Sequence, residues 1–155
     1  MTQHSHSHHA ATLPQVAAPP GAPVPRLLRG VLLLDAAGGL AMALAHSAFA
    51  GGIADRTGIP PGLVTASGAA LYPIAAFMAW TALRREMLTA AVWIVILGNV
   101  GWALASLALL AGFDIGANSL GRLYIAAQAL GVLLFAVLEV LALRRGLPAT
   151  ARGAS

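Results

Sequence analysis

Four long apolar runs, separated by short polar segments, constrain this chain more than any other feature. The runs cover residues 27–53, 62–83, 87–113 and 123–143. A helix needs about 20 mainly apolar residues to cross the hydrocarbon core of a bilayer, and each run is long enough. Arg29, Asp35 and His46 interrupt the first run, Glu139 interrupts the fourth, and the two middle runs carry no charge. The sequence therefore predicts four transmembrane spans.

Helices are the predicted form of these spans. An open strand in lipid leaves its backbone N–H and C=O groups without partners, whereas a helix satisfies them internally. The runs also lack the alternating pattern that is typical of outer-membrane barrels. Only 9% of the residues are charged, against about 25% in soluble domains. We therefore predict an all-α membrane protein whose transmembrane domain covers residues 26–145.

The segments between the runs predict how the helices are connected. "DRTGIPP" precedes the second span, "RRE" precedes the third and "DIGANSLGR" precedes the fourth. Asn118 or Ser119 is the expected N-cap of the last helix. Because loops this short force neighbouring helices to run antiparallel, the predicted fold class is an up-down-up-down four-helix bundle.

The distribution of arginine predicts the orientation of this bundle. Two arginines, Arg56 and Arg122, fall on one side, and seven fall on the other: Arg26, Arg29, Arg84, Arg85, Arg144, Arg145 and Arg152. Cytoplasmic loops are rich in basic residues, so both termini are predicted to be cytoplasmic. All nine basic residues are arginine, which together with abundant Ala and Gly suggests a bacterial inner-membrane protein. The alternative is a signal peptide cleaved after "AFA" (48–50), although Asp35 would interrupt its apolar region.

The terminal segments are predicted to be disordered tails, at residues 1–25 and 146–155. The first contains five prolines and many small residues, which give it too little apolar surface to fold. It also holds His4, His6, His8 and His9. Clustered imidazoles can bind a divalent transition metal, and the alternative is a low-complexity leader with no metal role. No other cofactor is predicted, and the absence of cysteine excludes thiolate ligands and disulfides.

Two acids within the apolar runs are the main candidates for a functional site. Asp35 lies six residues past Arg29, or about 9 Å deeper at 1.5 Å per residue. Glu139 lies five residues before Arg144, or about 7.5 Å deeper. Because the first and last spans run in opposite directions, both acids are expected at similar depth near the cytoplasmic side. If these two helices are neighbours, the carboxyl groups can meet.

Each predicted helix carries one polar stripe on an otherwise apolar surface. His46 follows Asp35 by eleven residues, about three helical turns, and Gln128 precedes Glu139 by the same interval. Asn99 leads the third stripe, with Trp102 and Ser106 beside it, and Tyr72 precedes Pro73 in the second run. We expect these stripes to face one another, with Asn99 and Tyr72 near the middle of the bilayer. The alternative for the uncharged residues is that they hold the helices together by hydrogen bonds.

Some of the same residues also have simple structural interpretations. His46, Tyr124, Trp80 and Trp93 are candidates for anchors at the membrane–water interface. The two acids can be kept neutral by burial, share one proton, or pair with an arginine of another helix. An intramembrane acid is nevertheless expensive and points to function by default. A structural tie between helices and a site for a proton, a cation or a polar ligand therefore both stay open for the acids.

The stretches "WIVILGNVGWALASLALL" and "LYIAAQALGVLLFAVLEVLALRR" carry a family resemblance. Through their span pattern and the placement of Asn99, Trp102, Gln128 and Glu139, residues 27–145 broadly resemble the DoxX-like group of small bacterial four-helix membrane proteins. This resemblance implies the four-helix fold but no catalytic residue. The small multidrug transporters are a second comparison, since they also carry an acid in the first span. The chain departs from them by having "VLLLDAAGGL" where they have an aromatic-rich face.

The functional interpretation follows from what the loops and spans contain. No metalloprotease, serine-hydrolase or nucleotide-binding motif is present, and loops of three to nine residues leave little room for an active site outside the membrane. We expect a non-enzymatic membrane protein, either an accessory subunit or a small-ligand binder. The alternative is a small proton-coupled transporter or channel-like protein that works as an oligomer.

Expected partners are the lipid bilayer and a second copy or another membrane protein. Nucleic acid is excluded because the arginines form no basic face.

Overall fold

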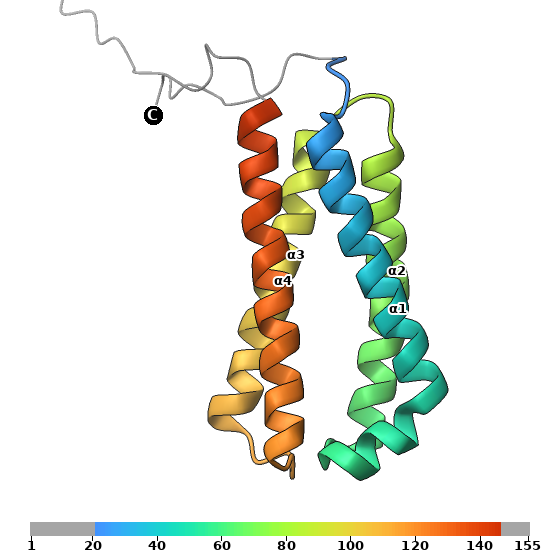
Figure 1. Ribbon diagram of the computed structural model, residues 1–155, viewed down its shortest axis with the longest axis vertical. Coiled ribbons are helices and arrows are strands. Elements are labelled where there is room, and N and C mark those ends of the chain that lie inside the picture. The colour runs from blue at the N-terminus through green and yellow to red at the C-terminus, as the bar shows by residue number, and fades with distance from the viewer. Residues whose placement is uncertain (1–20, 147–155) are drawn as a thin grey trace, which may run out of the picture.

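The protein is built from four long helices, as a computed structural model that describes residues 21–146 shows (Figure 1). They are α1 (Arg26–Thr57), α2 (Pro61–Leu83), α3 (Thr89–Gly112) and α4 (Ser119–Gly146). Each of the four is long enough and apolar enough to cross a membrane. The predicted all-helical fold with four candidate spans is thus confirmed, and the helices indicate a multi-pass membrane protein.

The boundaries of two helices differ from the predicted spans for local reasons. α1 continues beyond residue 53 to Thr57, although Phe49 has non-helical dihedral angles (φ −127°, ψ 22°) that kink it just before Gly51 and Gly52. α4 begins at Ser119 because the Asn118 side chain accepts a hydrogen bond from the Gly121 N–H at 3.0 Å. An N-cap of this kind satisfies one of the free N–H groups of the first helical turn.

Residues 21–25, the described part of the tail predicted for residues 1–25, contact the rest of the fold, and the other residues of both predicted tails lie outside the described residues except Gly146. The Met87 N–H donates to the Ala22 carbonyl at 2.8 Å, and Pro23 forms an isolated β-bridge with Glu86. Val24 is buried with Leu28 and Leu32 in the apolar core at this end. Pairing with the α2–α3 loop and burial of one valine therefore order a segment that its composition alone leaves unstructured.

The helices form two hairpins, and the packing between them is uneven. α1 packs closely on α2, α3 packs closely on α4, and the hairpins meet mainly where α1 contacts α4. α2 and α3 scarcely touch. Figure 1 shows the two hairpins side by side.

Contacts at both ends hold the hairpins together. At the end where α1 starts, Gly146 at the end of α4 lies against Pro25, which precedes α1. At the opposite end, the Asn118 N–H donates to the Thr57 carbonyl at 3.0 Å. Apolar cores lie at both ends, one around Leu28 and Leu32 and a smaller one formed by Ile59, Val64 and Ile125. The middle of the molecule lies between these two cores.

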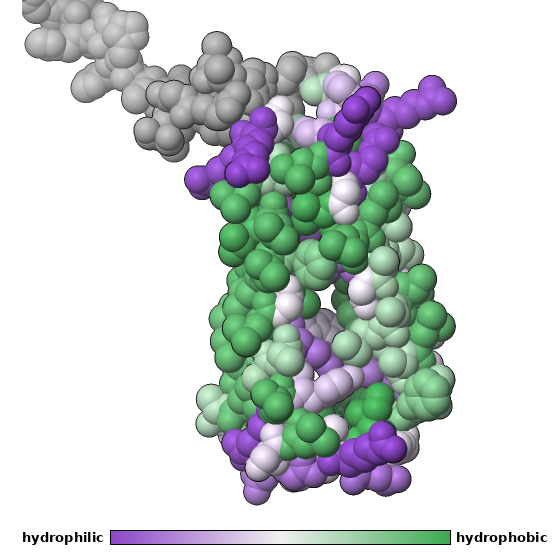
Figure 2. All heavy atoms as spheres, viewed as in Figure 1, coloured by the Kyte–Doolittle hydropathy of each residue, from purple (hydrophilic) through white to green (hydrophobic). Residues whose placement is uncertain are grey.

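The surface is apolar and part of the interior is polar, which is the reverse of a soluble protein. Large side chains such as Leu34, Leu97, Leu123 and Leu130 are each more than half exposed. Buried polar residues include Asp35, His46, Thr57, Thr81, Asn99, Ser106 and Glu139. Figure 2 shows hydrophilic residues gathered at the two ends and a hydrophobic band between them. Soluble proteins rarely expose so much contiguous apolar surface, so this band is suited to contact lipid.

Trp80 and Trp93 are both exposed on the outside of the bundle, at 46% and 44%. Trp80 stacks on Phe77, and the Arg84 guanidinium lies 4.9 Å from the centre of its ring. Such a cation–π contact joins an amphipathic ring to a charge at the arginine-rich end. These positions are compatible with the interfacial anchoring expected for both tryptophans.

Candidate functional site

Three buried polar side chains from three helices come together and form what we call the acid cluster: Asp35 of α1, Asn99 of α3 and Glu139 of α4. Asn99 Nδ2 donates to Asp35 Oδ2 at 2.7 Å and to Glu139 Oε2 at 3.4 Å. The two carboxyl groups also lie within interaction distance of each other. The structure thus brings together the two acids that the sequence places at one depth, and it adds Asn99, which the sequence places nearer the middle.

The acid cluster is almost inaccessible to solvent. Glu139 has an exposed fraction of 0%, Asn99 of 3% and Asp35 of 5%. Glu139 Oε1 has no hydrogen-bond partner among the described residues. A buried polar atom without a partner costs about 1–3 kcal/mol, and more when it is charged. One oxygen of the cluster is therefore left unsatisfied by the rest of the protein.

Within residues 21–146, no arginine forms an ion pair with either acid. Arg29, the nearest basic residue to Asp35 in the sequence, donates instead to the backbone carbonyl of Arg84. The interpretation in which arginines neutralise the acids across helices is not what the structure shows for the part of the chain that it describes.

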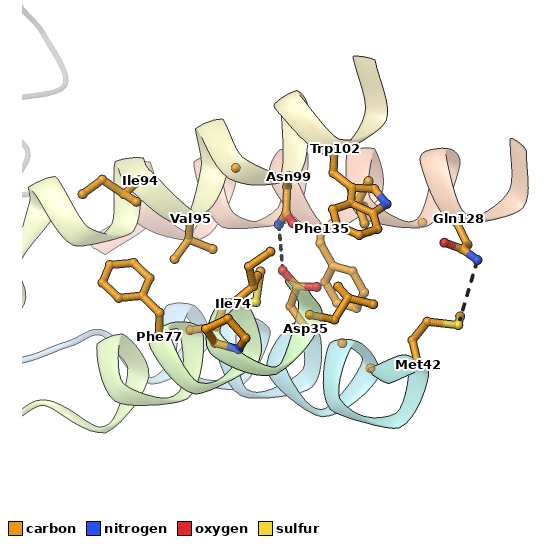
Figure 3. Close-up of a pocket in the computed structure, with 18 of the residues that line it drawn as sticks. Asp35, Met42, Ile74, Phe77, Ile94, Val95, Asn99, Trp102, Gln128 and Phe135 are labelled. Atoms are coloured by element: carbon orange, nitrogen blue, oxygen red, sulfur yellow. Dashed lines mark hydrogen bonds between the residues drawn. The ribbon is translucent and has the colours of Figure 1, made fainter. Parts of the chain in front are cut away.

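A cavity of about 630 Å³ lies between the two hairpins, next to the acid cluster. All four helices contribute to its wall, for example through Asp35 and Met42 of α1, Pro73 and Phe77 of α2, Asn99 and Trp102 of α3, and Gln128 and Phe135 of α4. Figure 3 shows Asp35 and Asn99 joined by their hydrogen bond at the cavity wall, with Trp102 and Phe135 beside them. The hollow between the hairpins is also visible in Figure 2. Polar groups are few in a wall that is otherwise apolar.

The cavity is open at the side. Ile74 of α2 and Ile94 of α3 line it and are both exposed on the bundle surface. These two helices scarcely touch one another. An added Cβ at Gly98 or Gly131 would meet no atom within 4 Å, so the cavity wall is loosely filled at these positions. A ligand dissolved in the bilayer would therefore have a direct route into the cavity between α2 and α3.

A second group of polar residues, the histidine cluster, lies towards the opposite end of the bundle and consists of His46, Ser67 and Tyr124. His46 Nδ1 is 2.9 Å from Ser67 Oγ, and His46 Nε2 is 2.7 Å from the Tyr124 hydroxyl. His46 is 3% exposed. It is therefore a buried link between α1, α2 and α4, whereas the sequence favoured an interface residue.

The sequence contains a signal for this second cluster that residue-by-residue interpretation missed. Tyr124 precedes Gln128 by one helical turn, on the polar stripe of α4. Ser67 precedes Gly68, where an added Cβ would lie only 2.7 Å from His46 Cβ. A small residue next to a polar one is typical of closely packed membrane helices joined by hydrogen bonds. The pattern therefore predicts a helix contact at Ser67.

The remaining candidate residues divide between the cavity and the outside of the bundle. Gln128 lines the cavity, and its Nε2 is 4.0 Å from Met42 Sδ, a contact drawn in Figure 3. Ser106 bonds only to the Trp102 carbonyl of its own helix, at 2.9 Å. Tyr72 does not face the other stripes: it is 36% exposed and donates to Ser47 Oγ at 3.1 Å. Its neighbour Pro73 lines the cavity instead.

The metal ligands expected at His4, His6, His8 and His9 lie outside the described residues. Among residues 21–146 there is no group of three or more histidine, cysteine or acidic side chains that could hold a metal ion. The acid cluster contains two carboxyl groups and one amide, and the cavity wall beside it is mostly apolar.

A multi-pass helical membrane protein with a buried acid pair beside a laterally open cavity is the class that this structure defines. No family model, no curated protein and no solved structure matches the chain.

Proposed function

We propose that this protein binds a small lipophilic ligand inside the membrane, without chemical conversion, in the cavity between its hairpins. The observation that carries the proposal is the cavity itself, with its volume of about 630 Å³ and its few polar groups. Ligand sites typically measure about 300–1,000 Å³ and combine an apolar wall with a small number of polar groups that fix orientation. This cavity favours a ligand binder over an accessory subunit, whose contacts with a partner would lie on the outer surface.

The proposed setting is the bacterial inner membrane, with the four helices crossing up-down-up-down and both termini in the cytoplasm. Support comes from the arginines at the ends of α1, α2 and α4, since basic residues accumulate on the cytoplasmic side. The broad resemblance to the DoxX-like group is part of the same proposal.

The fluorescence of Trp102 provides a test, because this side chain lines the cavity. In a chain that carries Trp80→Phe and Trp93→Phe, bromo-octanol added to proteoliposomes is expected to quench Trp102. A reference chain that keeps only Trp93, which is exposed outside the cavity, measures quenching by bromo-octanol dissolved in the lipid. Stronger, saturable quenching at Trp102 supports a binding site, and equal, unsaturable quenching at both tryptophans contradicts it.

A matched pair of glycine variants sharpens this test. Gly98 and Gly101 lie on α3, and an added Cβ meets no atom within 4 Å at either, but only Gly98 lines the cavity. Gly98→Leu is expected to fill the cavity and remove the saturable quenching of Trp102. Gly101→Leu is expected to leave it unchanged. Loss of quenching in both variants would point to a general disturbance of α3 instead of an occupied cavity.

Proton-coupled transport by an oligomer is the second candidate function. It is favoured by a smaller cavity of about 180 Å³ that is lined by His46 and Ser106 and shares Trp102, Tyr124 and Gln128 with the larger one. Polar groups thus follow one another from the acid cluster to the histidine cluster. Under this function, a pH gradient across proteoliposomes drives uptake of the bound ligand, and Asp35→Asn abolishes uptake while the protein stays folded. Binding without any gradient-driven uptake would leave only the first function.

A further inference from the structure

The acid cluster has too few hydrogen-bond donors and no positive charge. Two carboxyl groups share the single Nδ2 of Asn99, and Glu139 Oε1 has no partner among the described residues. Ionised carboxylates accept up to about four hydrogen bonds each. Buried charges are normally paired with an opposite charge. Because no arginine of residues 21–146 pairs with these acids, a bound group that carries donors and a positive charge would complement the cluster in its ionised form.

The position of the acid cluster relative to the cavity decides where a ligand group that supplies donors and positive charge can bind. Asp35 and Asn99 line the cavity, whereas Glu139 lies behind them and is fully buried. Besides Asp35 and Asn99, the only polar side chains in the wall among the described residues are Trp102, Tyr124 and Gln128, and none of them carries a positive charge. A group that reaches the acids from the cavity therefore meets the Asp35 carboxyl first, with the Glu139 carboxyl behind it.

We infer that the ligand of the cavity is a lipophilic organic amine, bound as its ammonium form with the charged nitrogen on Asp35 and the apolar part in the cavity. This inference rests on the proposed function. A primary ammonium group carries three N–H donors and one positive charge, which are the two properties that the acid cluster lacks. Charge-assisted hydrogen bonds of this kind are about twice as strong as neutral ones.

The chemistry of the wall argues against other classes of ligand. A lipophilic carboxylate would place a negative group beside the two acids and bring no donor, and like charges in a medium of low polarity repel strongly. A hydrated inorganic cation needs about six oxygen ligands or retained water, and the wall around Asp35 is apolar. A neutral alcohol can fill the same volume but brings one donor and no charge. The amine is the class that fits both parts of the site.

The route into the cavity agrees with a lipophilic amine. The opening lies between α2 and α3, at the exposed apolar side chains Ile74 and Ile94. An amine of this kind concentrates at the membrane interface and can move laterally between these helices with its apolar part in lipid. The arginine-rich end of the bundle repels a direct approach of the charged nitrogen from that side.

The test compares three probes of equal chain length: bromo-octylamine, bromo-octanol and bromo-octanoic acid. Each is titrated against proteoliposomes that contain the full-length chain with Trp102 as its only tryptophan, and quenching is divided by that of the chain that keeps only Trp93. This ratio removes differences in how the probes partition into lipid. The amine is expected to bind about tenfold or more tightly than the alcohol, and the acid most weakly.

Two isosteric variants locate the preference. Asp35→Asn is expected to reduce amine binding to the level of alcohol binding while alcohol binding stays the same. Glu139→Gln, which changes a residue outside the cavity wall, is expected to reduce the amine preference by a smaller factor. If Asp35→Asn fails to fold, the amine inference is still tested by comparing the three probes in the wild-type chain and in the Glu139→Gln variant.

The possible outcomes distinguish a failure of the amine inference from a failure of the proposed function. Equal binding of amine and alcohol in the wild type, or an amine preference that survives both Asp35→Asn and Glu139→Gln, overturns the amine inference while leaving a lipophilic site. If none of the three probes quenches Trp102 more than Trp93, and Gly98→Leu changes nothing, the proposed function itself fails.

Discussion

The acid cluster and the histidine cluster are buried in one bundle, yet they differ in how completely their polar atoms are paired. Both ring nitrogens of His46 have partners, at 2.9 and 2.7 Å from Ser67 and Tyr124. In the acid cluster, one amide nitrogen serves two carboxyl groups and one oxygen has no partner. A fully satisfied polar network stabilises and orders a fold, whereas an unsatisfied group needs an explanation such as a functional role. The comparison supports a structural role for the histidine cluster and the proposed binding role for the acid cluster.

The cavity beside the less completely paired acid cluster is also the larger of the two cavities. The acid cluster borders about 630 Å³, and the histidine cluster borders about 180 Å³. Close packing by Gly68 brings α2 against His46, whereas α2 and α3 scarcely touch beside the larger cavity. Tight packing thus accompanies complete pairing, and open space accompanies the unpaired oxygen.

The largest effect on stability is expected from Asn99→Leu. This variant roughly keeps the volume of the side chain but removes the one donor that Asp35 and Glu139 have among residues 21–146, so the free energy of unfolding should fall by about 3 kcal/mol. Unfolding by detergent titration in mixed micelles measures the change. The control is Ser106→Ala on the same helix, whose hydroxyl bonds only to its own helix and which should change stability by less than about 0.5 kcal/mol.

Close packing around His46 is tested by Gly68→Ala. An added Cβ would lie 2.7 Å from His46 Cβ, so α1 and α2 must move apart, and the free energy of unfolding should fall by about 2 kcal/mol. Gly62→Ala on the same helix is the control, because its Cβ would meet nothing within 4 Å. Alanine in an open helical position is worth about 0.5–1 kcal/mol more than glycine, so the two substitutions should have opposite signs. Equal effects would mean that the histidine cluster is not tightly packed.

Pairing within the histidine cluster is tested by Tyr124→Phe. Loss of the hydroxyl leaves His46 Nε2 without its partner and should lower the free energy of unfolding by about 1 kcal/mol. Tyr72→Phe is the matched control, since its hydroxyl bonds to Ser47 on the exposed surface and should matter little. The same detergent titration applies, and a larger loss in Tyr72→Phe would reverse the assignment of these two tyrosines.

The smallest effect is expected from Glu139→Gln. The amide keeps the shape of the side chain, brings donors of its own and removes one buried acid, so stability should stay constant or rise by about 1 kcal/mol. This result would show that Glu139 is not retained for stability. A loss above about 1 kcal/mol would instead make the acid cluster a structural brace and bring it into line with the histidine cluster.

The sequence predicted the helices well and the site only in part, for physical reasons that differ between residues. The length and apolar character of the four runs decide the spans locally, which is why the spans agree with α1 to α4 within a few residues. The meeting of Asp35 and Glu139 follows from depth alone once α1 and α4 are neighbours. Asn99 was placed too far from them because depth along a helix axis ignores the reach of a side chain across the bundle.

Two other placements depend on packing that a single sequence does not encode. The orientation of Tyr72 could not be derived because the few polar residues of α2 mark two different faces, one with Thr65 and Tyr72 and the other with Ser67 and Thr81. The burial of His46 depends on Gly68 of another helix, which lets the two backbones approach. The cavity likewise results from the weak contact between α2 and α3, which no pattern within either helix specifies.

The hydrogen bond between Asn99 and Asp35 spans 64 positions of the chain, and this separation matters for biogenesis. When the first span leaves the ribosome and meets the bilayer, neither Asn99 nor Glu139 has yet been synthesised. An acid within a span opposes insertion, by up to about 2.5–3.5 kcal/mol at the centre of the bilayer on insertion scales. The leucines and valines around Asp35 have to overcome that opposition alone, so substitutions that weaken them are expected to reduce the yield of inserted protein before they alter the finished bundle.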